Sequence, residues 1–163
     1  VGNNPQYESA LVEATTLAGD TKTSKSFVEI AQYYLTKSDK NKALEYYQQA
    51  LSLESDNFGV IRNILLLHID LMQYDEAASK SKKALDKYPS MPILYLINGV
   101  ALNKLKRAEE AVSVLEEGLD YIIDDTKMEI DFYNQLSVTY TLLNNELKAK
   151  AFSDKAKKLE NPN

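Results

Sequence analysis

Side chains that commonly carry chemistry are scarce in this chain of 163 residues. There is no Cys, which excludes thiolate nucleophiles, disulfides and thiolate metal sites. The single histidine, His68, is the natural candidate for an acid or a base, and it would need carboxylates converging on the same cleft. It lies, however, on an apolar helical stripe, where a packed and hydrogen-bonded histidine is the more common occupant. We therefore predict that His68 is a core residue.

Three pairs of adjacent acidic residues, at 109–110, 116–117 and 124–125, are the other candidates for chemistry. Carboxylates bind Ca²⁺ when they alternate with further oxygen ligands, and they act as acid and base when they face one another. The neighbours of these pairs lack that spacing. Residues 18–24 also lack the second Gly of a phosphate-binding loop. We predict solvated acidic surfaces, with no metal, no cofactor and no catalytic site, so that the protein is not an enzyme.

The charge of the chain disfavours nucleic acid as a partner. The formal net charge is −5 and the sequence pI is near 5.0, so the surface repels phosphate backbones on average. The basic stretches at 80–87 and 148–158 are interleaved with Asp or Ala and are interpreted as solubilising surface. The longest apolar run, 61–72, is interrupted by Arg62, Asn63, His68 and Asp70, so we predict no insertion of this segment into a membrane.

A repeat positions all of these residues. The alanines Ala43, Ala77 and Ala111 recur at an interval of 34 residues, each within a similar amphipathic segment. Ala149 follows Ala111 after 38 residues, which predicts a four-residue insertion within 120–127. Such a period indicates stacked supersecondary units rather than one globular core.

Each alanine-containing segment is preceded by a second amphipathic segment with helical spacing. Its apolar positions stand at i, i+3, i+4 and i+7, which is the stripe of a helix facing a core. Short polar joints at 37–40, 72–75, 105–107 and 144–145 separate the helices, so the sequence predicts antiparallel helix pairs. The four core stripes are Phe27, Ile30, Ala31 and Tyr34; Ile61, Ile64, Leu65 and His68; Tyr95, Asn98, Gly99 and Leu102; and Tyr133, Leu136, Ser137 and Tyr140.

This pattern resembles the tetratricopeptide repeat, whose period is 34 residues with large and small residues at set points. The unit at 24–57 matches through Phe27, Ile30, Ala31, Tyr34, Ala43, Tyr47 and Ala50. The resemblance implies an all-α fold, a right-handed superhelix of stacked antiparallel helix pairs. Four positions depart from the family pattern and are predicted to pack less tightly: Asn98, Gly118, Ser81 and Ser153.

The repeats predict the organisation of the chain. An N-terminal helix or partial repeat covers residues 1–23, and full repeats cover 24–57, 58–91, 92–129 with the insertion, and 130–163. The chain opens at Val1 rather than Met, which predicts a processed or trimmed piece. Near its end, Phe152, Ala156 and Leu159 are predicted to leave an apolar face, on which further repeats stack in the full-length protein or a second copy docks.

The resemblance implies that the first helix of each pair lines the concave side of the array. The residues next to the core stripe then form a groove for an extended peptide or an amphipathic helix. Much of this stripe is apolar, so two interpretations stay open: neighbouring helices bury it as core, or a partner covers it. The groove residues are Val28, Gln32, Leu35, Arg62, Leu66, Ile69, Leu96, Val100, Asn103, Asn134, Val138 and Thr141.

The function implied is a non-catalytic scaffold for protein–protein interaction. The alternative is a self-associating structural module or a spacer within a larger multi-repeat envelope protein. One subgroup of the family grips chaperone tails with a set of Lys, Asn and Arg side chains, but Ile93 and Ile97 stand where this sequence would need cations. That ligand is therefore disfavoured. Tyr33, Tyr46, Tyr88 and Tyr121 are predicted to be partly exposed and to serve as contact anchors. The composition, rich in Lys, Asn, Asp and Tyr, is similar to that of long repeat proteins of bacterial cell envelopes, which favours a periplasmic or envelope location.

Overall fold

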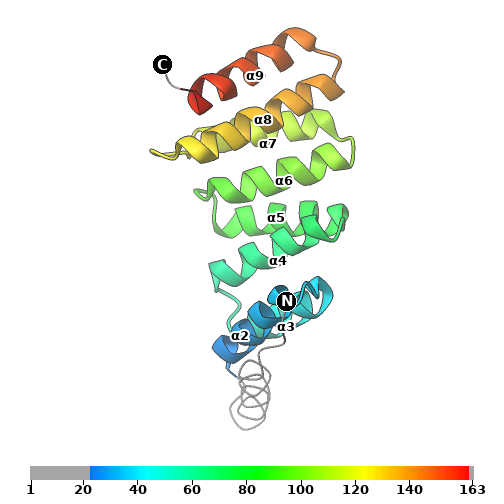
Figure 1. The fold of residues 1–163 in the computed structure, drawn as a ribbon, viewed down its shortest axis with the longest axis vertical. Coiled ribbons are helices and arrows are strands. Elements are labelled where there is room, and N and C mark those ends of the chain that lie inside the picture. The colour runs from blue at the N-terminus through cyan, green and yellow to red at the C-terminus, as the bar shows by residue number, and fades with distance from the viewer. Residues whose placement is uncertain (1–22, 162–163) are drawn as a thin grey trace. The chain divides into compact units, whose positions relative to one another are not determined.

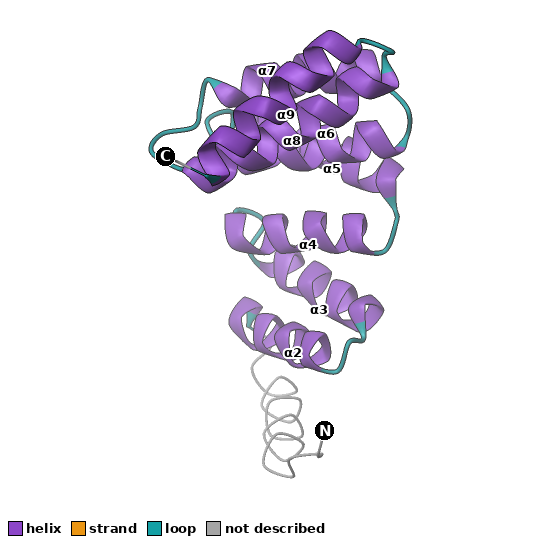
Figure 2. Cartoon of the chain, turned by 45° about the horizontal axis from the view of Figure 1, so that its top comes forward, coloured by secondary structure: helices purple, strands orange, loops and turns teal. Residues whose placement is uncertain are grey.

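The computed structural model describes residues 23–161, which form helices and loops throughout (Figures 1 and 2). The N-terminal helix predicted for residues 1–23 lies almost wholly outside this range. Within the described residues the antiparallel helix pairs are confirmed. The helices are α2 (Ser24–Thr36), α3 (Lys40–Leu53), α4 (Phe58–Asp70), α5 (Tyr74–Lys87), α6 (Pro92–Lys104), α7 (Ala108–Leu119), α8 (Thr126–Leu142) and α9 (Glu146–Glu160).

The chain forms two compact units, and the border between them lies within α4. The first unit ends at Leu67 and contains the α2–α3 pair, whose helices pack against each other. The second unit begins at His68. In it, α6 packs against α5, α7 and α8, and α8 packs against α7 and α9 (Figure 1). Helix α6 is therefore the most enclosed element of the second unit, and residues on several of its sides are buried.

Side chains at the helix starts explain where the helices begin. An Asp, Asn or Thr just before a helix accepts a hydrogen bond from a backbone N–H that has no partner within the helix. Asp39 caps α3 in this way, Asp125 caps α8 and Asn145 caps α9. Thr23 and Ser26 cap α2 reciprocally. Pro92 occupies the first turn of α6, where its missing N–H costs nothing.

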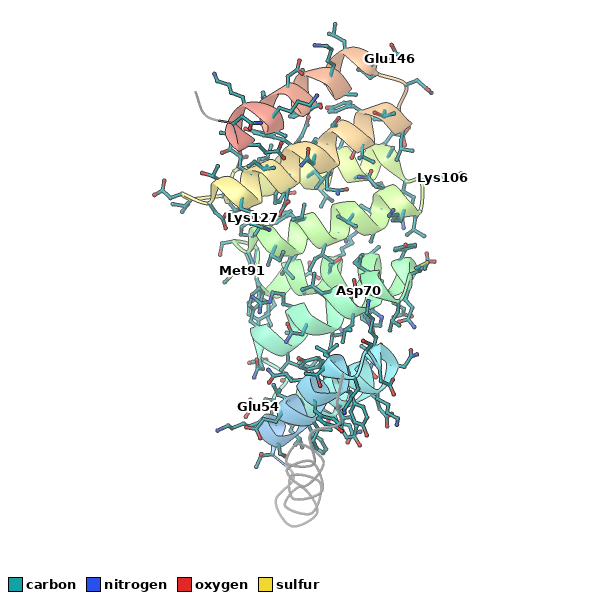
Figure 3. All side chains as sticks on the ribbon, viewed as in Figure 1. Glu54, Asp70, Met91, Lys106, Lys127 and Glu146 are labelled. Carbon is teal, nitrogen blue, oxygen red and sulfur yellow. The ribbon has the colours of Figure 1, made fainter. Side chains whose placement is uncertain are left out.

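The joints inside the helix pairs share one backbone feature. Ser38, Met72, Lys106 and Asn144 all have positive φ angles, between 55° and 59°. They stand at equivalent positions, each directly before the residue that caps or precedes the second helix of its pair. The left-handed conformation reverses the chain within a few residues, and none of the four is glycine. Figure 3 shows Met91 and Lys106 at opposite ends of α6. Lys106 belongs to the joint that follows this helix.

Small residues let the helices of each unit approach closely, as predicted. Ala31, Ala43 and Ala50 are fully buried in the first unit, and Ala77 and Ala111 in the second. Gly99 lies against α7 so closely that a Cβ atom there would stand 2.5 Å from Leu115 Cγ. Real Cβ contacts are not that short, so only glycine fits this crossing of α6 and α7.

The prediction of looser packing at the departures from the family pattern is wrong for three of them. Gly118 is buried between Tyr95 Cβ and the ring of Phe132, and a Cβ atom there would stand 2.6 Å from Phe132 Cε1. Asn98 and Ser81 compensate for each other, because Asn98 Nδ2 donates to Ser81 Oγ at 2.8 Å. Both are buried. Two polar residues in contact thus replace two apolar ones without leaving a gap.

Near the predicted insertion, the longer first helix is the main difference from the other repeats. Helix α7 ends at Leu119, and α8 begins at Thr126 and runs for 17 residues, against 13 in α2, α4 and α6. The core stripe of α8 also differs from the one predicted. Phe132 is fully buried, whereas Tyr133 and Ser137 are only half-buried.

The apolar face predicted near the C-terminus is largely occupied within the second unit. Ala156 is buried, and Leu159 is half-buried. The Phe152 ring stacks on Tyr140, with centroids 5.6 Å apart, and leans on Tyr133 at 5.9 Å. The equivalent rings of the first unit repeat this arrangement, since Tyr46 stacks on Tyr34 at 5.4 Å. Phe152 is therefore an internal packing residue rather than a free docking surface.

Candidate functional site

The predicted groove residues of the first unit lie mostly at the surface. Gln32 and Arg62 are exposed, and Val28 is half-buried. Leu35 and Leu66 keep 38% and 42% of their surface accessible. Large apolar side chains exposed on well-formed helices are free to contact a partner.

The groove residues of the second unit divide into exposed and packed positions. Val138 is 47% exposed, and Asn134 and Thr141 beside it on α8 are also exposed. Leu96 and Val100 on α6 are half-buried. The interpretation of the stripe as core thus applies in part, because these two side chains retain only some accessible surface.

Ile69 and Asn103 contribute to the packing of the helices and expose little of their surface. Ile69 is half-buried against a core cluster that includes Ala77, Ala101 and Leu102. Asn103 is buried.

Asn103 joins the two helices that carry most of the stripe in the second unit. Thr139 Oγ1 of α8 lies 2.9 Å from Asn103 Oδ1 of α6. The Asn103 amide also reaches the Gln135 carbonyl at 3.4 Å. These bonds hold α6 beside α8. The stripe residues Leu96 and Val100 of α6 and Val138 of α8 therefore lie on adjacent helices. Asn103 positions the stripe and offers little of itself to a partner.

His68 is buried and hydrogen-bonded, as predicted. Its Nδ1 lies 2.7 Å from Oε1 of Gln73, the residue that precedes α5. The Gln73 backbone N–H donates to the His68 carbonyl at 2.8 Å, so the two residues brace the joint between α4 and α5. His68 Nε2 is buried without a hydrogen-bond partner among residues 23–161. In that same range no three metal-ligating side chains gather into a cluster that would hold an ion.

The charged surfaces carry local ion pairs of the kind the sequence predicts. Lys80 pairs with Glu76 at 3.3 Å, and Lys150 pairs with Asp154 at 2.8 Å, each one turn apart on a second helix. Solvent screens exposed pairs of this type, so they contribute little to stability. No helix in the described part of the chain combines the length and the apolarity needed to cross a bilayer.

The four tyrosines predicted as contact anchors are all half-buried. Two of them are held in intramolecular stacks: Tyr46 lies on Tyr34, and Tyr121 lies on Tyr95 with centroids 5.2 Å apart. Their outer faces remain accessible, but their orientation is set by the fold itself.

Sequence reasoning did not identify a groove on the other side of the second unit. Helices α5 and α7 form its walls, α6 forms its floor, and its volume is about 660 Å³. The signal was present in one departure from the family pattern, because Asn98 places a polar side chain on the floor. Ala78 and Ser79 add small side chains along the α5 wall.

Comparisons with known proteins agree with this architecture. Two family models, both described as tetratricopeptide repeat, match residues 3–132 and residues 130–163. No match was found among curated proteins. Solved structures are more informative about the fold. MamA (residues 41 to the end) of Desulfovibrio magneticus RS-1 superposes with a TM-score of 0.80 at 16% identity, over 94% of this chain and 85% of that one.

Two further structures show the same likeness. MamA of strain AMB-1 has a TM-score of 0.78 at 19% identity, over 96% of this chain and 90% of its own. A thermophilic tetratricopeptide protein of Thermus thermophilus, TTC0263, has a TM-score of 0.69 at 17% identity, over 85% of this chain and 75% of its own. At such low identity these similarities concern the fold alone.

Proposed function

Because the chain belongs to the tetratricopeptide repeat family, we propose that it is a non-catalytic scaffold that binds a peptide or an amphipathic helix of a protein partner. The binding surface is the outward stripe of the first helices. The family is in general a protein-interaction module, and it is typically non-catalytic. In the first unit the stripe lies on α2 and the first part of α4, and in the second unit it lies on the end of α4, on α6 and on α8. Each unit's stripe is proposed as a binding surface by itself.

The observation that carries the proposal is where the exposed apolar side chains lie. Among the described residues of α2, α4, α6 and α8, the large hydrophobic side chains classed as exposed are Leu35, Leu66, Val138 and Leu142. Three of these four belong to the predicted stripe, and Leu142 lies one turn beyond Val138. Covering apolar surface contributes about 25 cal/mol per Å². A partner helix with apolar residues at i, i+3 or i+4 and i+7 supplies that cover.

Polar residues beside the apolar positions complement this surface. Asn134 and Thr141 flank Val138 along α8, and both are exposed. They offer donors and acceptors to a peptide backbone while Val138 and Val100 contact apolar side chains. An apolar centre with a polar margin is the usual composition of a specific protein interface.

Affinity capture from the native host tests the proposal. The bait is the wild-type protein beside a Val100→Glu/Val138→Glu variant. The matched control is Leu53→Glu/Leu147→Glu, which places the same two charges at exposed apolar residues of second helices. We expect a partner that binds the wild type and the control but loses affinity for the stripe variant by at least about tenfold, or 1.4 kcal/mol. A partner retained equally by all three proteins would place the binding site elsewhere.

Self-association through the C-terminal helix is the less well-supported alternative, because Phe152 and Ala156 are engaged in internal packing. The envelope location implied by the composition stays a prediction. It requires a signal or lipidation segment upstream of Val1 in the full-length gene, and a gene that starts directly before Val1 would contradict it.

A further inference from the structure

The groove between α5 and α7 is a second concavity, separate from the stripe on α6 and α8. It lies wholly within the second unit, has a volume of about 660 Å³, and runs between α5 and α7. On α5 it extends from Asp75 to Asp86, a length of about 16 Å at 1.5 Å per residue. An extended peptide of about five residues, at 3.3 Å each, spans that distance.

The floor of the groove presents an unused hydrogen-bond acceptor. Asn98 is only 4% exposed and lines the groove from α6. Its Nδ2 donates to the Ala78 carbonyl at 2.7 Å and to Ser81 Oγ at 2.8 Å, which fixes the orientation of the amide. Among the described residues, Asn98 Oδ1 accepts no hydrogen bond. An acceptor that is fixed in orientation and open to the groove favours a ligand that brings a donor.

The walls of the groove carry an excess of negative charge. Its carboxylates are Asp75, Asp86, Glu110 and Glu117, and its cations are Lys82 and Arg107. Arg107 is already bound to Glu110 by two hydrogen bonds of 2.7 Å. At the end of the groove away from Arg107 and Glu110, the charged lining residues are Asp86 and Glu117.

Tyr95 lies next to one of those two carboxylates. Its hydroxyl lies 2.8 Å from the Pro89 carbonyl and 3.2 Å from Glu117 Oε1, so the two acceptors share one proton. Glu117 stands on the α7 wall, and Asp86 stands on the α5 wall. Between them, the side chains of Leu85 and Val114 make the lining partly apolar.

We propose that this groove is a second interaction surface, which binds a short extended segment of another protein that carries Lys or Arg next to an apolar residue. The cationic side chain lies between Asp86 and Glu117, and a backbone N–H of the segment donates to Asn98 Oδ1. The apolar residue covers Leu85 and Val114. Charge complementarity selects this occupant, because the carboxylates of Asp86 and Glu117 on the two walls would repel an acidic segment.

The probe for this proposal is a fluorescein-labelled, end-capped peptide of alternating Lys and Leu residues. Its counterpart carries Glu in place of Lys. Binding is measured by fluorescence anisotropy at low and at physiological ionic strength, since screening weakens exposed ion pairs. The protein variants are Asp86→Asn/Glu117→Gln, which keeps side-chain shape, and Ser79→Phe, which fills the groove from an exposed position of its wall.

Three controls separate the groove from its surroundings. Glu45→Gln/Glu109→Gln removes the same charge from exposed residues outside the groove lining. Ser113→Phe introduces the same ring one repeat later, at an exposed residue of α7. Val138→Glu alters the stripe of the proposed scaffold function. Circular dichroism of each variant verifies that it is folded.

We expect the Lys–Leu peptide to bind the wild type and all three controls, and the Glu–Leu peptide to bind none of them. Ser79→Phe abolishes binding, and Asp86→Asn/Glu117→Gln weakens it by about fivefold. The proposal is overturned by a wild type that does not bind the Lys–Leu peptide, or by charge controls that weaken binding as much as the groove variant. Loss of binding in Val138→Glu alone would overturn it too, by moving the peptide to the stripe.

Discussion

Asn98 on α6 donates a hydrogen bond to Ser81 on α5 at 2.8 Å, and both side chains are buried. The two residues belong to successive repeats, and each replaces a residue that the family usually has apolar. The pair therefore ties one repeat to the next by a polar contact, and its members depend on each other.

That dependence is measurable. We expect Asn98→Leu to lower the free energy of unfolding by about 1–2 kcal/mol, although Leu is the residue typical of the family, because Ser81 Oγ loses its donor. In a double-mutant cycle with Ser81→Ala, the coupling energy is about 0.5–1.5 kcal/mol. Urea unfolding of the four proteins gives the cycle, and strictly additive effects would show that the two residues act independently.

Gly118→Ala is expected to destabilise the protein despite a better helix propensity. The gain in propensity is about 1 kcal/mol, but the added Cβ atom collides with Tyr95 and Phe132, and such overpacking costs about 1–3 kcal/mol. Gly59 is the matched control, since the nearest atom to a Cβ atom there, Asn57 Oδ1, is 3.4 Å away. Thermal unfolding then gives a lower midpoint for Gly118→Ala than for Gly59→Ala. The reverse order would contradict the packing described for α7.

The left-handed residues of the joints predict a stabilising substitution. Met72 has a φ of 56°, which is the left-handed backbone conformation. This conformation costs free energy for an L-residue with a side chain, whereas glycine adopts it without that cost. After allowing for the extra freedom of glycine in the unfolded chain, Met72→Gly raises the free energy of unfolding by about 0.5–1 kcal/mol. Asn144→Gly gains less, because Asn tolerates this conformation. Chemical unfolding compares the two, and a destabilised Met72→Gly protein would argue against strain at this joint.

The stability of the protein is expected to fall at alkaline pH in a way that depends on Tyr133. Its hydroxyl donates to a Glu129 carboxylate oxygen, and this bond together with partial burial raises the pKa of Tyr133 to about 12. The unfolded chain has an ordinary pKa of about 10, so the folded state holds the proton more tightly. The resulting stabilisation is complete below about pH 10 and is lost as pH rises through about 12.

Glu129→Gln isolates this effect, because it removes the carboxylate and keeps the shape of the side chain. We expect the pKa of Tyr133 to move back towards its ordinary value, and the loss of stability between these two pH values to become shallower. Ultraviolet titration of tyrosinate in the two folded proteins measures the shift. Superimposable titration curves would show that Glu129 does not control Tyr133.

The repeat period made most of the fold predictable. The interval between Ala43, Ala77 and Ala111 defines the helix pairs, and the structure buries all three alanines at helix contacts. The side of each helix that faces a second neighbour was harder to predict. Leu94, Ile97 and Ala101 on α6 are buried on a side that the simple amphipathic pattern does not single out, since α6 packs against three other helices.

The candidate sites were predictable only in part, for a related reason. Exposure of Leu66 and Val138 follows from their position beside the core stripe. Burial of Asn103 does not, because it depends on Thr139 and Gln135, which are more than thirty residues further along the chain. The groove between α5 and α7 likewise combines residues of three helices, from Asp75 on α5 to Glu117 on α7, and periodicity within one helix carries no information on such combinations.

The central claim, that partners bind the stripe of the first helices, is tested most directly by site-specific cross-linking in the native host. The sequence contains no Cys, so a single introduced thiol gives a signal without background. Val138→Cys and Leu147→Cys place that thiol at exposed positions of α8 and α9, and a thiol-reactive photo-cross-linker is attached to each. We expect a defined protein adduct from position 138 and none from position 147. Adducts of equal yield at both positions, or at position 147 alone, would contradict the claim.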